Sequence, residues 1–228
     1  MGKRFVAAGT QARSLARANP RSVDRLDAYL ERLASDSPVP GGGSAATLVA
    51  AIGAALTAMV GRIAGRRPKP PDAAATLAEI VTRSEELRAE LKTAQEHDEK
   101  AFQRVVSAQA LPKATPAEAQ ARREALEFAL ERAAEAPLRA SALCLRVLEL
   151  AAQLLELETN ALVSDIGCAA EFAYAAVAAC AYNVRVNHKY MKETATIARQ
   201  EARLRTHEAA AHQLLHQIRT QISQDLTN

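Results

Sequence analysis

Apolar residues recur three or four positions apart along most of this chain, the spacing that places them on one face of an α-helix. No stretch shows the alternation of apolar and polar residues that is typical of half-buried strands. The predicted fold class is therefore all-α, a helical bundle. The expected helices cover about residues 22–33, 44–64, 72–110, 115–135, 137–158, 164–190 and 192–224.

Three of these helices have distinct patterns. Neither glycine nor proline interrupts residues 72–110, so we predict a long central helix there. Residues 44–64 are apolar nearly all round, which indicates a buried core helix rather than a membrane span. Apolar residues at seven-residue intervals predict an amphipathic C-terminal helix that docks on the bundle or on a partner subunit: Ile197, Leu204, Ala211 and Ile218.

A proline- and glycine-rich segment, residues 35–44, joins the first two helices. Its three glycines permit backbone conformations that a Cβ atom would forbid, and Ser44 follows as the expected N-cap. Free N–H groups at such a helix start suit a carboxylate, a phosphate or a ring carbonyl. No Gly-Lys-Ser/Thr follows, so the segment is not a P-loop.

Other helix starts are marked by local signals. Thr115 and Glu118 form a capping box around Pro116. Pro137 is expected to end one helix and begin the next. Ser164 and Asp165 are expected to cap the helix that follows.

Composition narrows the class of protein. The 228 residues suit one domain, and 29 basic against 26 acidic residues give a net charge of +3, too balanced to indicate a nucleic-acid partner. Residues 1–21 are basic and resemble a transit peptide in composition, but we interpret them as a disordered tail before a helical domain at 22–228. Three unpatterned cysteines in apolar surroundings predict buried free thiols in a soluble, cytoplasmic protein: Cys144, Cys168 and Cys180.

Asp98 is the best candidate for chemistry, because it lies in the apolar register of the helix over 72–110. A carboxylate facing the interior is costly unless it is paired or used as an acid or base, and both interpretations stay open. Asn183 and Asn187 share a face and could read a heterocycle or face solvent. Three possible metal ligands recur at every fourth position near the C-terminus: Glu208, His212 and His216. Their spacing is not that of a HExxH site, so we assign no metal.

Several motifs, in order over about residues 24–190, resemble the cyclodeaminase domain of formiminotransferase-cyclodeaminase and the related methenyltetrahydrofolate cyclohydrolases. They are Pro40-Gly41-Gly42-Gly43-Ser44, Gly53-Ala54-Ala55-Leu56 with Met59-Val60, Gly65-Arg66-Arg67, Asp98-Glu99-Lys100-Ala101-Phe102, Leu111-Pro112-Lys113-Ala114-Thr115-Pro116, Ala136-Pro137-Leu138, Ser164-Asp165 with Gly167, and Asn183-Val184-Arg185-Val186-Asn187.

The resemblance implies a homodimeric helical enzyme that acts on the one-carbon bridge between N5 and N10 of tetrahydrofolate. Such an enzyme needs no metal and no cofactor beyond the tetrahydrofolate substrate. The resemblance implies no nucleic-acid or membrane partner. It assigns catalysis to Asp98, Asp165 and Lys113. It assigns substrate contacts to Gly41, Gly42, Gly43, Ser44, Arg66, Ser164, Asn183 and Asn187.

Two departures from the family pattern bear on substrate preference. Glu158-Thr159 stands where members usually carry Gly-Asn, and the segment after Arg67 is proline-rich and lacks an aromatic residue. No formiminotransferase domain is present in these 228 residues, which favours cyclohydrolase over cyclodeaminase activity. A helical scaffold that kept the fold and lost the chemistry is the alternative of another class, and a nucleic-acid binder using the basic tail is a weaker one.

Overall fold

The computed structural model describes residues 20–157 and 162–227 and contains six helices in that part of the chain. Residues 1–19 of the expected basic tail and the Glu158-Thr159 departure therefore lie outside the described residues, whereas the last two residues of that tail, 20 and 21, begin the first helix. The chain divides into two compact units, Met1–Pro38 and Val39–Asn228. The first unit contains α1 (Pro20–Leu33), whose C-terminal carbonyl at Arg32 accepts a hydrogen bond of 2.7 Å from Ser35 Oγ.

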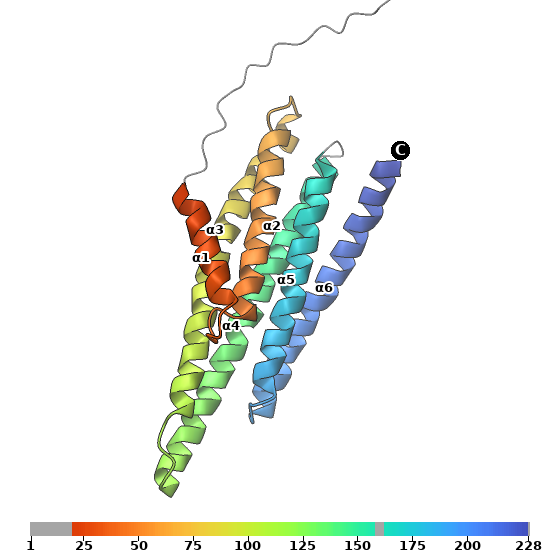
Figure 1. The fold of residues 1–228 in the computed structure, drawn as a ribbon. Coiled ribbons are helices and arrows are strands. Elements are labelled where there is room, and N and C mark those ends of the chain that lie inside the picture. Colours follow the sequence, from red (N-terminus) through yellow and green to blue (C-terminus); the bar gives the residue numbers. More distant parts are fainter. Residues whose placement is uncertain (1–19, 158–161, 228) are drawn as a thin grey trace, which may run out of the picture. The chain divides into compact units, whose positions relative to one another are not determined.

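The second unit is a bundle of five helices, so the all-α prediction is confirmed (Figure 1). Its short connections join helices that are packed side by side. The helices are α2 (Gly42–Ala64), α3 (Pro71–Gln109), α4 (Pro116–Leu157), α5 (Val163–His188) and α6 (Thr194–Thr227).

Small residues let the central helices approach closely. A Cβ atom on Gly53 of α2 would lie 3.0 Å from the carbonyl oxygen of Ala169 on α5, and one on Gly61 would lie 2.8 Å from Val81 of α3. The buried core is accordingly rich in alanine and leucine, and α2 is central to it. Both α2 and α5 are long and apolar enough to cross a membrane, but core helices pass the same test, and 56% of the most apolar window of α2 is buried inside the bundle.

One prediction about α4 was wrong. We expected Pro137 to separate two helices, but α4 continues through it. Proline has no N–H to donate to the carbonyl four residues earlier, which here belongs to Ala133. That carbonyl instead accepts a hydrogen bond of 3.2 Å from Asn187 Nδ2 of α5. The helix therefore keeps this backbone acceptor satisfied without a break.

The helix starts match the sequence signals unevenly. The capping box of α4 is confirmed, because Glu118 N donates to Thr115 Oγ1 at 3.2 Å and Thr115 N donates to Glu118 Oε2 at 2.9 Å. Ser44 is not the N-cap of α2: the helix begins two residues earlier, at Gly42, after Gly41. Ser164 likewise lies inside α5, whose first residue is Val163 and whose N-cap makes no side-chain hydrogen bond.

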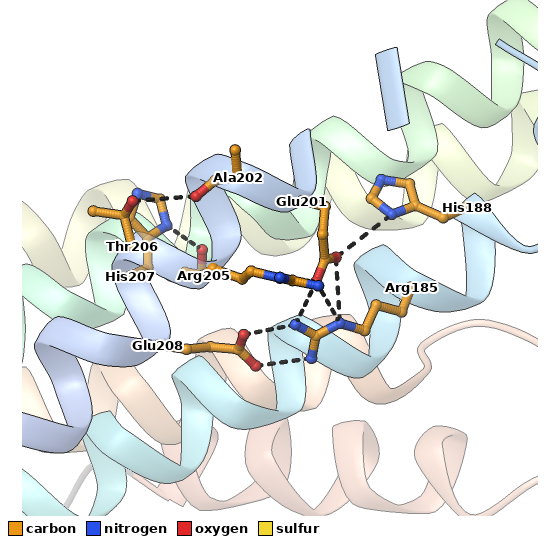
Figure 2. A network of polar contacts seen from close by, with 9 residues as sticks. Arg185, His188, Glu201, Ala202, Arg205, Thr206, His207 and Glu208 are labelled. Atoms are coloured by element: carbon orange, nitrogen blue, oxygen red, sulfur yellow. Dashed lines mark hydrogen bonds and ion pairs between the residues drawn. The ribbon is translucent and has the colours of Figure 1, made fainter. Parts of the chain in front are cut away.

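A charged network fastens α6 to the C-terminal part of α5 (Figure 2). Arg185 donates two hydrogen bonds to the carboxylate of Glu208, at 2.8 and 2.6 Å. It also donates one of 2.9 Å and two longer ones of 3.3 Å to Glu201. Burial disfavours the charge of Glu201, but the hydrogen bonds from Arg185 and Arg205 outweigh it and hold the pKa of Glu201 below its ordinary value. Glu208, considered above for a metal, is thus the partner of a guanidinium that links the end of α5 to α6.

Candidate active site

The site is built where the N-terminus of α2 meets the C-terminal half of α3. A Cβ atom added to Gly43 would lie only 2.6 Å from Asp98 Cγ, so the carboxylate occupies the space of a side chain at position 43. The described glycines have no positive φ. Glycine is therefore required at position 43 for close approach, and not for the unusual backbone conformation that we expected.

Ser44 binds the two neighbouring carboxylates of α3 with different atoms. Its backbone N–H donates a hydrogen bond to Asp98, as expected of a free amide in the first turn of a helix. Its hydroxyl donates a hydrogen bond of 3.1 Å to Glu99 Oε1. The hydroxyl is thus a contact to α3, because Ser44 lies inside α2 instead of capping it.

The surroundings raise the pKa of Asp98 to about 6. Partial burial makes the largest contribution, because it removes water from the charged form, and the negative charge of Glu99 adds to it. The N–H of Ser44 acts in the opposite direction, since it stabilises the carboxylate. A carboxyl group that titrates near neutral pH can both accept and donate a proton, which is what general acid–base catalysis requires.

Two side-chain amides of α5, those of Asn183 and Asn187, belong to the same region as the start of α2. A Cβ atom on Gly42 would be 3.4 Å from Asn183 Nδ2, so Asn183 faces the start of α2. Asn183 Nδ2 donates a hydrogen bond of 2.8 Å to the carbonyl of Ala179. Asn187 Nδ2 donates another of 2.8 Å to the carbonyl of Asn183. The structure thus brings together Gly42, Gly43, Ser44, Asp98 and Asn183, with Asn187 one turn further along α5.

Asp165 lies in a different part of the bundle. Helices α2 and α5 run antiparallel, because Gly42 adjoins Asn183 whereas Gly53 adjoins Ala169. Asp165 precedes Asn183 by 18 residues of continuous helix, which corresponds to ~27 Å along α5. Ser164 is exposed in the same first turn of α5. Because the two helices are antiparallel, Ser164 and Asp165 lie near the C-terminal end of α2 and far from Asp98.

The two predicted basic residues also lie away from Asp98. Arg66 is exposed just after α2, at the end of the bundle that holds Asp165. Lys113 is exposed in the loop between α3 and α4. Eleven residues of α3 follow Asp98, so the loop begins ~17 Å from it along the helix axis. The roles of Arg66, Lys113, Ser164 and Asp165 stay predictions.

Glu99 is a site residue that the sequence pattern did not reveal. It lies outside the apolar stripe of α3, where a charged residue is expected to be solvated, and nothing local marks its contact with Ser44. The only available signal was its position next to Asp98, since a neighbouring negative charge raises the pKa of a partly buried carboxyl group.

Comparisons with known proteins agree with the resemblance. The family model described as Formiminotransferase-cyclodeaminase matches residues 25–206. A protein of Methylorubrum extorquens named methenyltetrahydrofolate cyclohydrolase is 36% identical over 172 residues, 75% of this chain and 83% of that protein. The formimidoyltransferase-cyclodeaminase of Rattus norvegicus is 30% identical over 168 residues, 74% of this chain but 31% of the rat protein.

A solved structure has the same fold. The crystal structure of formiminotetrahydrofolate cyclodeaminase from Thermotoga maritima superposes with a TM-score of 0.80 at 24% sequence identity, covering 90% of this chain and 99% of that one. The match to the family model and the identity to the Methylorubrum protein together show that this chain is a member of the formiminotransferase-cyclodeaminase family.

Proposed function

We propose that this protein is a methenyltetrahydrofolate cyclohydrolase, which converts 5,10-methenyltetrahydrofolate and water to 10-formyltetrahydrofolate. The observation that carries the proposal is the half-buried Asp98, held against Gly43 and Ser44 with its pKa near 6. The 36% identity to a protein of that name supports the direction of the reaction. The protein is accordingly an enzyme of folate one-carbon metabolism.

The chemistry assigns two proton transfers to Asp98. Its ionised carboxylate accepts a proton from water as the water oxygen bonds to the methenyl carbon, which forms a tetrahedral carbinol. The protonated carboxyl then donates to N5 as the C–N5 bond breaks, and the carbinol O–H proton passes to solvent as the formyl C=O forms. Water thus loses two protons, of which N5 keeps one. No step in this scheme calls for a metal or a redox cofactor.

The carboxamides and the aromatic ring near Asp98 suit a flat heterocycle. Asn183 and Asn187 offer amide groups on one side, and Phe102 lies one helical turn beyond Asp98 with 39% of its surface exposed. Exposed aromatic faces stack on planar rings, and amides recognise their donors and acceptors. We therefore assign the pterin ring to this region.

We further propose that the enzyme is a homodimer in which Asp165 of a second copy approaches Asp98. No charged residue lies between Ser44 and Gly61, and the outward face of α2 exposes 45% of Ile52 and 37% of Met59. On α5, which packs against α2, Tyr182 is 75% exposed. Such an apolar face suits an isologous contact, and a two-fold axis perpendicular to the helices brings opposite ends of two copies together.

The competing activity is that of a formimidoyltetrahydrofolate cyclodeaminase, in which N10 attacks the formimino carbon and ammonia leaves. It is favoured by the names of the rat protein and of the Thermotoga structure. The same carboxyl group would serve both reactions, because both pass through a tetrahedral carbon. The enzyme family and the balanced charge suggest a soluble, cytosolic protein without a nucleic-acid partner.

The decisive experiment follows the near-ultraviolet absorption of the methenyl bridge in the presence of the purified protein. Loss of absorption from 5,10-methenyltetrahydrofolate, faster than in buffer and absent with Asp98→Asn, identifies a cyclohydrolase. Growth of absorption from 5-formiminotetrahydrofolate identifies a cyclodeaminase instead. If neither substrate reacts with folded protein, the enzyme proposal is wrong and the catalytically inactive scaffold stands.

A further inference from the structure

A second candidate site lies between α3 and α4, and Asp98 is not among the residues that line it. One cavity of about 250 Å³, here called the basic cavity, shares lining residues with an apolar cavity of about 300 Å³. Arg104 of α3 and Arg132 of α4 line both cavities. The basic cavity is also lined by His97, Lys100, Glu135 and Arg139, and the apolar one by Ala108, Leu111, Ala125, Phe128 and Ala129.

Positive charge in the basic cavity exceeds negative charge. Glu135 is the carboxylate among its lining residues, and it faces four cationic side chains. This carboxylate is already engaged, because it accepts hydrogen bonds from Arg203 at 3.0 and 3.1 Å and one of 3.4 Å from Arg139. The carboxylate of Glu135 therefore does little to neutralise Arg104 and Arg132.

These two arginines have no hydrogen-bond or ion-pair partner among residues 20–157 and 162–227. The guanidinium of Arg132 lies over the ring of Phe128, 5.3 Å from its centroid. Phe128 itself is 60% exposed beside the apolar cavity. Guanidinium groups bind carboxylate and phosphate oxygens through parallel N–H bonds, so two of them on facing helices are suited to a multiply charged anion.

Another cavity between α3 and α4 provides an internal comparison. It also measures about 300 Å³ and also presents two arginines, Arg83 and Arg146. There, however, Arg83 pairs with Glu86, and Arg146 pairs with Glu149 at 2.9 Å. Excess positive charge is therefore a property of the basic cavity and not of the α3–α4 groove as a whole.

We propose that these two cavities bind one organic anion that carries two or more negative charges and a flat ring. Arg104 and Arg132 hold its charged groups in the basic cavity, and its ring lies in the apolar cavity against Phe128. Such a ligand matches both the charge of one cavity and the apolar lining of the next. Asp98 instead faces Gly43 of α2, so the proposal does not depend on the folate chemistry.

The test is isothermal titration of the full-length protein at low salt with three probes. Adenosine diphosphate carries phosphate and a ring, benzoyl-glutamate carries carboxylates and a ring, and pyrophosphate carries charge alone. We expect saturable binding of at least one ring-bearing probe, and the first two probes distinguish phosphate from carboxylate ligands. Because the ring adds contacts, we expect pyrophosphate to bind more weakly. Absence of binding by both ring-bearing probes at millimolar concentration overturns the proposal.

Matched variants locate the site. The double variant Arg104→Gln/Arg132→Gln should weaken binding by about 100-fold or more, since each charge-assisted contact contributes about 10- to 100-fold. Arg83→Gln/Arg146→Gln removes the same charge from the neighbouring cavity and should change binding less than about threefold. Equal losses in the two double variants would show non-specific attraction and refute the site. All four arginines are at the surface or only partly buried, and unchanged helical circular dichroism checks folding. An unchanged affinity in Phe128→Ala would refute the role of the ring.

Discussion

The carboxylate of Asp98 fills the space that a side chain at position 43 would occupy, so Gly43 and Asp98 behave as one packed unit from two helices. The adjacent glycine is not under this constraint, because a Cβ atom on Gly42 would make only an ordinary contact with Asn183 at 3.4 Å. The two glycines therefore provide a natural pair of test and control positions.

Gly43→Ala should displace Asp98 and reduce kcat for methenyltetrahydrofolate hydrolysis by at least about tenfold, because proton transfer depends on position. Gly42→Ala should keep kcat within about threefold, because it leaves Asp98 in place, and any lost substrate contact should appear in KM instead. Steady-state kinetics on both variants, with thermal melts to verify folding, measures the difference. Equal activities would show that the contact between Gly43 and Asp98 is irrelevant to catalysis.

Asp98→Asn should reduce kcat by about 100- to 10,000-fold, the usual contribution of a general acid–base group. The same change should stabilise the protein at pH 8. The pKa of Asp98 rises from 3.8 to about 6 on folding, so its ionisation costs stability as the pH rises through this window. The gain is at most about 3 kcal/mol, and solvent screening reduces it. Denaturant titrations at pH 5 and pH 8 measure it. A variant that is less stable at pH 8 would contradict the burial of this charge.

Glu99→Gln should lower the pKa of Asp98, since it removes the neighbouring negative charge while keeping an acceptor for the hydroxyl of Ser44. For a base, kcat/KM rises with pH through the pKa of the free enzyme, here about 6. The rising limb of the pH profile should therefore move to lower pH. Glu96→Gln, an exposed change on the same helix, is the control and should leave the limb in place. An unmoved limb in Glu99→Gln would assign it to another group.

The proposed dimer predicts complementation between two inactive variants. If each site combines Asp98 of one copy with Asp165 of the other, mixing Asp98→Asn with Asp165→Asn protein restores one intact site per mixed dimer. Random exchange should then recover about a quarter of the wild-type activity. The assay is turnover after refolding the two variants together. No recovery, with dimers present by light scattering, would exclude a shared site.

Much of this fold follows from helical periodicity alone. The apolar stripe of α3 is buried as predicted, from Leu77 through Leu91 to Val105, and the capping box of α4 forms. The two predictions that were wrong, a helix break at Pro137 and an N-cap at Ser44, depend on contacts with residues distant in sequence. The cost of Pro137 is offset by Asn187, fifty residues later, and Ser44 contacts Glu99 rather than its own helix end.

The candidate site was predictable only in part. Asp98 was identifiable because a carboxylate interrupts an apolar stripe, which is a local signal. That Asp165 lies at the other end of the bundle follows from the antiparallel packing of α2 and α5, which no spacing along the chain encodes. Glu99 was missed for the same reason, since its contact is made by another helix.

The proline inside α4 also determines what Asn187 can recognise. Both amide hydrogens of Asn187 are engaged, one by the carbonyl that Pro137 leaves without its helical donor and the other by the carbonyl of Asn183. These two acceptors fix the orientation of the amide, and its remaining hydrogen-bonding capacity is that of the oxygen alone. If Asn187 contacts the substrate as proposed, the helix defect in α4 leaves it able to accept hydrogen bonds from ligand N–H groups but not to donate to ligand carbonyls.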